Sequence, residues 1–297
     1  MERENLIVIA GPTATGKSAL AVKIAKQFGG EIISADSRQI YKYLNIGTGK
    51  ITRNEMRGVK HYCLGIADPK TSFTVVDYKR CAQQAIADIA AKRKLPIMVG
   101  GTGFYIKALT DDISFPQVKP DKALRKYLKK KSAPELFNIL ETSDAKRAHA
   151  IGQHNKRRLI RAIEIVNTTG GPIPKLKLAR HFRVLMIGIK KTPKELRKAI
   201  QKTLTLRIKK GVLKEVKNLH FKHGISWQRL CNLGLDYKYI SLYLKEQMEK
   251  KEALDKLEVE LWRYAKRQTT WFKKEKRIKW IRSERETVSL VRGFLKN

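Results

Sequence analysis

The chain has 297 residues, and its 64 lysines and arginines outnumber its 27 acidic residues, which gives a formal net charge of +37. A hydrophobic content of 42% excludes a wholly disordered protein, and no apolar run approaches the roughly 20 residues that a membrane-spanning helix needs. The excess of positive charge indicates a polyanionic partner, with nucleic acid as the leading candidate. Membrane-surface binding and generic surface lysine are the alternatives.

The N-terminal region does not have the pattern of a signal peptide, because Glu2 and Glu4 interrupt the stretch where its basic residues would stand. We therefore expect a cytoplasmic protein without a membrane partner. We also expect it to act as a monomer.

The first third of the chain alternates between strand and helix patterns. Residues 5–10 form a short apolar run before a glycine-containing loop, which predicts a buried strand followed by a helix. Further strands are predicted at 31–36 and 95–99, with a helix over about 75–93 between them. This alternation predicts an α/β fold with a parallel sheet, helices on both faces, and a site beyond the carboxyl ends of the strands.

The middle of the chain is strongly basic and helical in pattern, after which 182–189 has the pattern of another core strand. A helical insertion within one α/β domain explains this return to the core better than two consecutive domains do. The predicted core is 1–118 with 182–297, and the predicted insertion is 119–181. The remainder of the core, over about 193–280, is predicted to form several helices.

The segment Gly11–Ser18, here called the phosphate loop, matches the pattern G-x-x-x-x-G-K-[ST] between a strand and a helix. Its backbone N–H groups and the helix N-terminus favour phosphate oxygens. Lys17 can neutralise phosphate charge, and the Ser18 hydroxyl can ligate Mg²⁺. The loop predicts a di- or triphosphate ligand, ordinarily ATP, without selecting the chemistry. The expected contacts are Gly11, Pro12, Thr13, Ala14, Thr15, Gly16, Lys17 and Ser18.

Two polar residues follow the next predicted strands. Asp36 ends the second strand, so its carboxylate is expected to face the phosphate loop. It can act as a general base, as a Mg²⁺ ligand, or as the cap of the following turn. Thr102 follows two glycines after the third strand, where an ATPase more usually has a metal-linked aspartate. Its hydroxyl can bind a substrate or cap the next helix.

Six segments, taken in chain order, are more specific together than any one of them. They are Gly11–Ser18, Ile33–Tyr41, Asn45–Thr48, Val99–Tyr105, Arg157–Glu164 and Tyr264–Trp271. As an ordered set they resemble the tRNA dimethylallyltransferase family, and the resemblance extends to about Trp280.

The resemblance implies a P-loop-like core with a helical insertion, a tRNA anticodon stem-loop as acceptor, and dimethylallyl diphosphate as donor. The adenine immediately 3′ of the anticodon would be flipped into a channel, because its amine cannot be alkylated while stacked. The diphosphate would lie on the phosphate loop with Mg²⁺, and Ser18 would be the metal ligand. Asp36 matches the general base of the family, and Thr102 matches a residue placed near the substrates.

The resemblance also implies tRNA contacts in three segments. Cations interleaved with aromatics near Tyr264 suit a single-stranded loop, but Tyr264 and Trp271 also follow the helical spacing of Leu254, Leu257 and Leu261 and are expected in the core. The residues that match tRNA-contacting positions are Asp36, Ser37, Arg38, Gln39, Arg157, Arg158, Arg161, Lys266, Arg267 and Gln268.

The sequence departs from the family after the core strand. The family often carries Arg-Ile-x-x-Arg there, with an arginine that helps to hold the diphosphate, whereas this chain has Ala199-Ile-Gln-Lys-Thr203. Lys198 or Lys202 would be the substitute, although lysine lacks the guanidinium fork. A shift of one position also turns a helical side chain by about 100°.

Three other functions remain open at this point. A small-molecule kinase explains the phosphate loop and Asp36 but does not require a charge of +37. A prenyltransferase of free adenine nucleotides does not require a long basic insertion. A non-catalytic RNA-binding protein leaves the phosphate loop unexplained.

Overall fold

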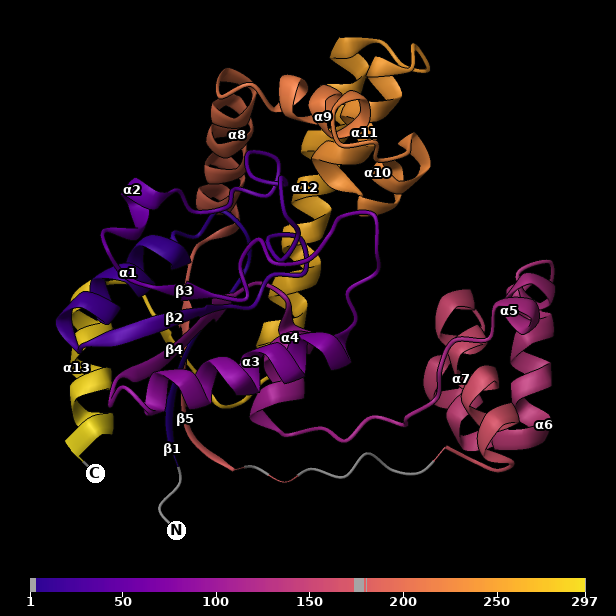
Figure 1. The fold of residues 1–297 in the computed structure, drawn as a ribbon, viewed down its shortest axis with the longest axis horizontal. Helices are drawn as coiled ribbons and strands as arrows, with labels where there is room; N and C mark the ends of the chain where they lie inside the picture. The colour runs from indigo at the N-terminus through magenta and orange to yellow at the C-terminus, as the bar shows by residue number, and fades with distance from the viewer. Residues whose placement is uncertain (1–3, 174–178, 180, 297) are drawn as a thin grey trace. The chain divides into compact units, whose positions relative to one another are not determined.

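The computed structural model describes residues 4–173, 179 and 181–296. The chain forms two compact units, Met1–Asp112 with Arg180–Asn297 and, separately, Ile113–Ala179. The first unit contains the sheet, and the second contains the helices α5, α6 and α7 (Figure 1). In the described part of the chain, none of the helices combines the length and apolar character needed to cross a bilayer.

A six-stranded sheet with the order β3-β2-β4-β1-β5-β6 forms the centre of the first unit. All of its pairings are parallel, which confirms the predicted α/β fold class. The strands are β1 (Glu4–Ala10), β2 (Gly30–Ser34), β3 (His61–Tyr62), β4 (Leu95–Gly100), β5 (Phe182–Ile189) and β6 (Ile278–Ile281). The predicted strand at 31–36 is therefore shorter than expected, and Asp36 lies two residues beyond it.

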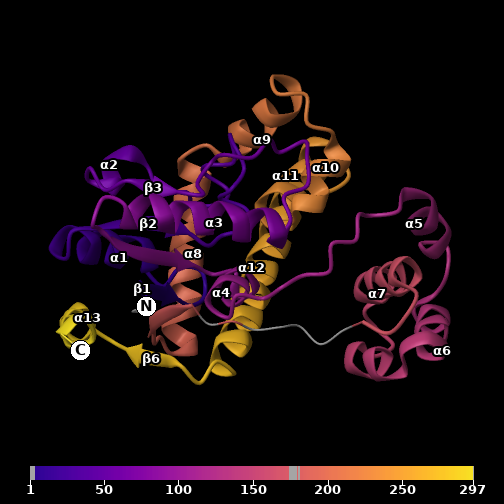
Figure 2. The same ribbon diagram turned by 60° about the horizontal axis from the view of Figure 1, so that its bottom comes forward.

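Two hydrophobic cores cover the two faces of this sheet. Successive side chains of a strand point to opposite faces, so Leu6 and Val8 of β1 belong to one core and Ile7 and Ile9 to the other. The first core includes α3 (Val75–Ala90) and α4 (Gly103–Thr110), whereas the second includes α1 (Lys17–Gln27) and α13 (Glu284–Lys296). Figure 2 shows these helices around the strands.

The helices after β5 form the wall opposite the phosphate loop. Helix α8 (Pro193–Lys209) packs on the long helix α12 (Lys250–Lys273) through a core that includes Leu204 and Leu261. Along the chain, α8 and α12 are separated by α9 (Val212–Phe221), α10 (Trp227–Leu233) and α11 (Leu235–Leu244). The helices predicted over 193–280 are thus present up to Lys273, where the chain returns to the sheet as β6. A short α2 (Arg53–Met56) precedes β3.

The second unit has its own hydrophobic core, which includes Leu128, Leu140 and Leu159, and one buried carboxylate joins two of its helices. Its helices are α5 (Lys122–Leu128), α6 (Ala133–Ile151) and α7 (Lys156–Thr169). Glu164 of α7 is 1% exposed and accepts hydrogen bonds from Arg125 Nε and Nη2 at 2.6 and 2.7 Å. It also accepts one from the Asp121 backbone at 3.1 Å. This pairing joins α5 to α7. Burying a carboxylate is costly unless its oxygens accept hydrogen bonds, so these donors also stabilise Glu164 in its buried position.

The close approach between the ends of β2 and β4 determines where Asp36 lies. The Ala35 N–H donates to the Val99 carbonyl at 2.7 Å, and the Thr102 N–H donates to the Ala35 carbonyl at 3.1 Å. A side chain at Gly100 would overlap the main chain of Ala35. Only glycine permits this approach without moving the backbone.

We predict that G100A lowers the free energy of unfolding by at least about 2 kcal/mol, because the added methyl group has no space. The matched control is G293A in α13, where nothing lies within 4 Å of the added methyl group. That variant should be neutral or stabilised by up to about 1 kcal/mol. Chemical denaturation followed by circular dichroism measures both, and equal midpoints would contradict the close approach.

Candidate active site

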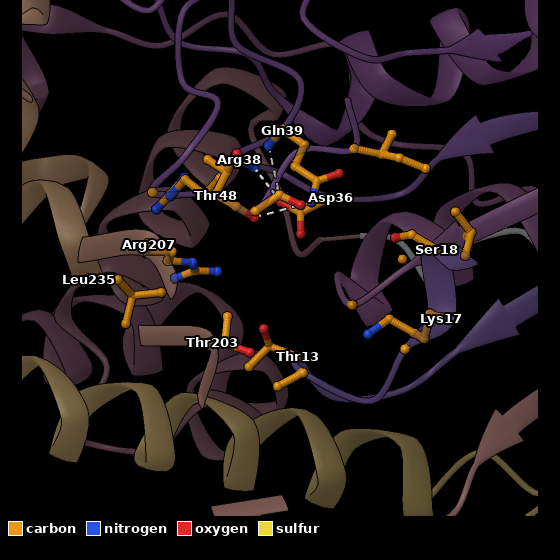
Figure 3. A pocket seen from close by; sticks show the side chains of 18 of the residues that line it. Thr13, Lys17, Ser18, Asp36, Arg38, Gln39, Thr48, Thr203, Arg207 and Leu235 are labelled. Atoms are coloured by element: carbon orange, nitrogen blue, oxygen red, sulfur yellow. Dashed lines mark hydrogen bonds between the residues drawn. The ribbon is translucent and has the colours of Figure 1, made fainter. Parts of the chain in front are cut away.

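A cavity of about 520 Å³ lies beyond the carboxyl ends of the central strands, where the α/β fold predicts a site. The phosphate loop forms one wall and residues 36–49 form another (Figure 3). Residues of α1, α2, α8, α10, α11 and α12 line much of the rest. All of its lining residues belong to the first unit.

The phosphate loop has the tight conformation that its sequence predicts. Gly11 and Gly16 have φ angles of +139° and +87°, which side-chain-bearing residues rarely adopt. The Thr15 hydroxyl donates to the Pro12 carbonyl at 2.9 Å, and the same carbonyl accepts from the Lys17 ammonium. Gly11, Pro12 and Thr15 are buried and shape the loop. The cavity is lined by Thr13, Ala14, Gly16, Lys17 and Ser18.

The surroundings of Lys17 change the pKa of its ammonium. Burial lowers the pKa of its ammonium from 10.5 to about 8, and the nearby Asp36 carboxylate offsets part of that effect. An anion bound next to this ammonium would favour the charged form. Phosphate oxygens next to Lys17 would therefore oppose the effect of burial on its pKa.

Of the three roles considered for Asp36, the hydrogen bonds show that of a turn cap. Within the described residues, both hydrogen bonds to its carboxylate reach Oδ1, from the N–H groups of Arg38 at 2.8 Å and Gln39 at 3.2 Å. These bonds cap the turn after β2. The carboxylate lines the cavity and in Figure 3 faces the same space as Lys17 and Ser18. Oδ2 is therefore available for a ligand or a proton.

Thr102 holds the Asp36 turn. Its hydroxyl accepts the Ser37 N–H at 3.0 Å. Although Thr102 occupies the N-cap position of α4, its side chain makes no capping bond there, so the capping interpretation of the hydroxyl is wrong. Gly100 and Gly101, rather than Thr102, belong to the cavity lining.

Arg38 and Gln39, which follow Asp36 in the sequence, line the cavity and connect it to other segments. The Arg38 Nε donates to the Leu233 carbonyl at 2.7 Å, and the Gln39 amide donates to the Thr48 carbonyl at 3.2 Å. The turn that begins at Asp36 is thereby held by α10 on one side and by the segment ending at Gly49 on the other.

Gln268 occupies a different environment from its neighbours Lys266 and Arg267, which are exposed. It is 6% exposed, accepts the Thr13 N–H at 2.9 Å and donates to the Gly101 carbonyl at 2.9 Å. Its amide thus joins α12 to the phosphate loop and to the end of β4. Both ends of this amide are therefore bonded inside the protein.

The aromatic residues of α12 divide into three environments. Phe272 is 2% exposed and belongs to the core, and Tyr264 lines the cavity. Trp271 is 39% exposed, so the prediction of a core position for it is wrong. Its indole lies against Gly103, where a side chain would overlap it. Helical spacing identified the apolar face of α12, and Trp271 lies at the edge of that face.

The arginines of α7 also differ from one another. Arg157 and Arg158 are exposed. Arg161 is half-buried, donates to the Val118 carbonyl at 2.8 Å and pairs with Glu164 at 3.5 Å. Arg161 therefore has a structural partner within the second unit, whereas Arg157 and Arg158 extend to the surface.

Four site residues escaped the sequence analysis. Glu215 accepts the N–H groups of Asn45, Ile46 and Gly47 at 3.0, 2.6 and 3.0 Å, together with the Tyr237 hydroxyl at 2.9 Å. This bonding explains why Asn45–Thr48 keeps its position. The other two are Arg207 and Asp236, which pair at 2.8 Å beside the cavity.

The sequence deviation at Ala199–Thr203 is located at the cavity wall. Thr203 lines the cavity, whereas Lys198 and Lys202 are exposed on other faces of α8. Arg207, one turn after Thr203, is the arginine of α8 that lines the cavity. The sequence did not predict that Arg207 lines the cavity, because Arg207 lies outside the positions 199–203 that correspond to Arg-Ile-x-x-Arg.

The fold and the site together define a P-loop protein with a carboxylate facing the phosphate loop. The family model described as IPP transferase matches residues 39–275. A tRNA dimethylallyltransferase from Thermoanaerobacter sp. (strain X514) is 39% identical over 93% of this chain and 91% of its own. Another from Acetivibrio thermocellus is 40% identical over 95% and 92%.

Solved structures agree with these relatives. The tRNA isopentenylpyrophosphate transferase from Bacillus halodurans has a TM-score of 0.75 and 34% identity, covering 99% of this chain and 97% of its own. A eukaryotic dimethylallyltransferase acting on tRNA has a TM-score of 0.76 and 25% identity, covering 90% and 69%. The chain belongs to the tRNA dimethylallyltransferase family.

We predict that Q268E destabilises the protein. Its carboxylate would still accept the Thr13 N–H but would bring a second oxygen against the Gly101 carbonyl, which costs about 1–3 kcal/mol in a buried place. Q228E on exposed α10 makes the same charge change and should alter the free energy of unfolding by less than about 0.5 kcal/mol. Urea denaturation compares them, and an undisturbed Q268E would show that Gln268 is not a structural link.

Proposed function

We propose that this enzyme transfers the dimethylallyl group of dimethylallyl diphosphate to the exocyclic amine of an adenine in tRNA, next to the 3′ side of the anticodon. The observation that carries the proposal is the position of the Asp36 carboxylate, which faces the same cavity as Lys17 and the phosphate loop. An alkyl transfer of this kind needs a site for a diphosphate and a base for the amine within one space.

The proposed reaction assigns a role to each wall of the cavity. The adenine nitrogen forms a bond to the allylic carbon, whose bond to the diphosphate oxygen breaks and leaves its electron pair on the diphosphate. Asp36 Oδ2 accepts the proton released by the amine. The phosphate loop N–H groups and Lys17 stabilise the charge that develops on the leaving diphosphate. Thr102 supports the reaction by holding the Ser37 N–H, and with it the Asp36 turn.

The cavity wall also fits a magnesium ion carried by the diphosphate. Mg²⁺ prefers oxygen ligands and commonly binds through one or two protein groups plus substrate phosphates and water. Ser18 offers a hydroxyl next to Lys17, and the described residues contain no group of three or more acidic, histidine or cysteine side chains placed to hold a metal ion by themselves. When bound there, Mg²⁺ would neutralise diphosphate charge and so assist its departure.

The exposed cations of the chain suit the proposed tRNA partner. Arg157 and Arg158 in the insertion, and Lys266 and Arg267 on α12, present unburied charges that phosphates can approach. We propose that the insertion contacts the anticodon stem while residues 36–39 approach the flipped nucleotide. We also propose that the enzyme acts as a monomer.

The substrates are tested by incubating the protein with labelled dimethylallyl diphosphate, Mg²⁺ and either unmodified tRNA or AMP. A parallel reaction contains ATP and candidate small-molecule acceptors. We expect label on tRNA alone and no phosphoryl transfer from ATP. Label on AMP but never on tRNA would identify a free-nucleotide prenyltransferase, and phosphoryl transfer without prenylation would identify a kinase.

The role of Asp36 is tested by D36N, which keeps Oδ1 as an acceptor for the Arg38 and Gln39 N–H groups but removes the base. We expect the single-turnover rate on tRNA to fall about 10²- to 10⁴-fold, with tRNA affinity changed less than about two-fold. Rapid-quench kinetics and filter binding separate these effects. Normal chemistry combined with weakened tRNA binding would reassign Asp36 to recognition.

A further inference from the structure

Arg207 is a buried cation beside the cavity that the proposed chemistry has not used. It lies near the end of α8, is 8% exposed and lines the cavity. In Figure 3 its guanidinium points into the cavity from the wall opposite Lys17. The two cations therefore approach one space from two sides.

The guanidinium is only partly satisfied by the protein. Its Nη1 donates to Asp236 Oδ2 at 2.8 Å, whereas Nε is buried and has no partner among the described residues. A buried donor without a partner costs free energy, so native proteins rarely keep one without a use. Because the protein satisfies only part of this guanidinium, Arg207 retains donor capacity for an acceptor in the cavity that it lines.

The surroundings of Arg207 fix its orientation. Asp236 is fully buried at the start of α11, next to Tyr237, whose hydroxyl donates to Glu215 at 2.9 Å. A side chain at Gly49 would bring its Cβ to 3.2 Å from Arg207 Nη2, so glycine leaves the space that the guanidinium occupies. Asp236 is therefore a positioning residue that orients the Arg207 guanidinium.

The spacing along α8 explains why this arginine stands where it does. Ala199, Thr203 and Arg207 are four residues apart, so they share one face of the helix, and Thr203 and Arg207 both line the cavity. The first two of these positions carry no charge. At a rise of about 1.5 Å per residue, Arg207 lies about 6 Å beyond Thr203 along the helix axis, a distance that the length of an arginine side chain can compensate.

We propose that Arg207 binds a phosphate group of the diphosphate donor, and of the leaving diphosphate, from the wall opposite the phosphate loop. The assignment rests on the proposed function for the presence of a diphosphate ester in this cavity. Arginine suits this task because its planar fork donates two parallel hydrogen bonds to phosphate oxygens. Asp236 holds Nη1, and the rest of the guanidinium is left to bind the phosphate group.

The test is direct titration of magnesium pyrophosphate by isothermal titration calorimetry on the full chain. R207M should weaken pyrophosphate binding about 10- to 100-fold, because it removes charge-assisted hydrogen bonds. The matched control is R197M, which removes the same charge from an exposed position of the same helix and should change the Kd less than about two-fold. Unchanged affinity in R207M would overturn the assignment.

A second variant allows the same test if R207M alone misfolds. R207M leaves the Asp236 carboxylate buried without a partner, which is destabilising, so R207M/D236N removes both charges. It should bind pyrophosphate as weakly as R207M and melt at a higher temperature. Wild-type pyrophosphate affinity in the folded double variant would show that the phosphate does not contact Arg207.

Binding of tRNA distinguishes the two sources of phosphate. We expect R207M to retain the tRNA Kd of the wild-type protein within about two-fold. Loss of tRNA affinity with normal pyrophosphate affinity would assign Arg207 to the RNA backbone and overturn the proposal. The titration needs no catalysis, so failure of the wild-type protein to prenylate tRNA would contradict the proposed function while leaving the pyrophosphate result for Arg207 intact.

Discussion

The close approach of the chain after β2 to the end of β4 is the constraint on which the site depends. Gly100 permits it, and the backbone bonds of Ala35 to Val99 and Thr102 maintain it. The approach places Asp36 and Thr102 next to one another, and the parallel order of the sheet brings both beside the loop that follows β1. A base and a phosphate site thus share one cavity because three neighbouring strands end at the same edge.

Polar side chains from the C-terminal helices hold the other side of this cavity. Gln268 joins α12 to the phosphate loop and β4, Glu215 holds residues 45–47, and Asp236 orients Arg207. Each of these groups is buried or half-buried, so its hydrogen bonds fix position more firmly than exposed pairs would. The phosphate loop is therefore enclosed by helices that come more than 180 residues later in the chain.

Much of this arrangement was predictable from the sequence. The phosphate loop, the core strand at 182–189 and the position of Asp36 follow from short local patterns. Gln268 was not predictable as a structural link, because its role depends on Thr13 and Gly101, which are distant in sequence. Strand β6 was not predictable either. It has only four residues, and its buried Ile278 and Ile281 flank two exposed residues, so burial does not alternate along it as a strand pattern requires. Arg207 escaped detection because the expected spacing pointed one helical turn earlier.

The central claim is that one cavity holds both the donor diphosphate and the tRNA adenine, with Asp36 between them. The most direct measurement is a crystal structure of the protein with an anticodon stem-loop and an unreactive thiolo analogue of dimethylallyl diphosphate. It should place the exocyclic amine of the flipped adenine about 2.6–3.2 Å from Asp36 Oδ2, with the diphosphate on Lys17. An adenine amine outside hydrogen-bond reach of Asp36, with the diphosphate bound elsewhere, would contradict the account.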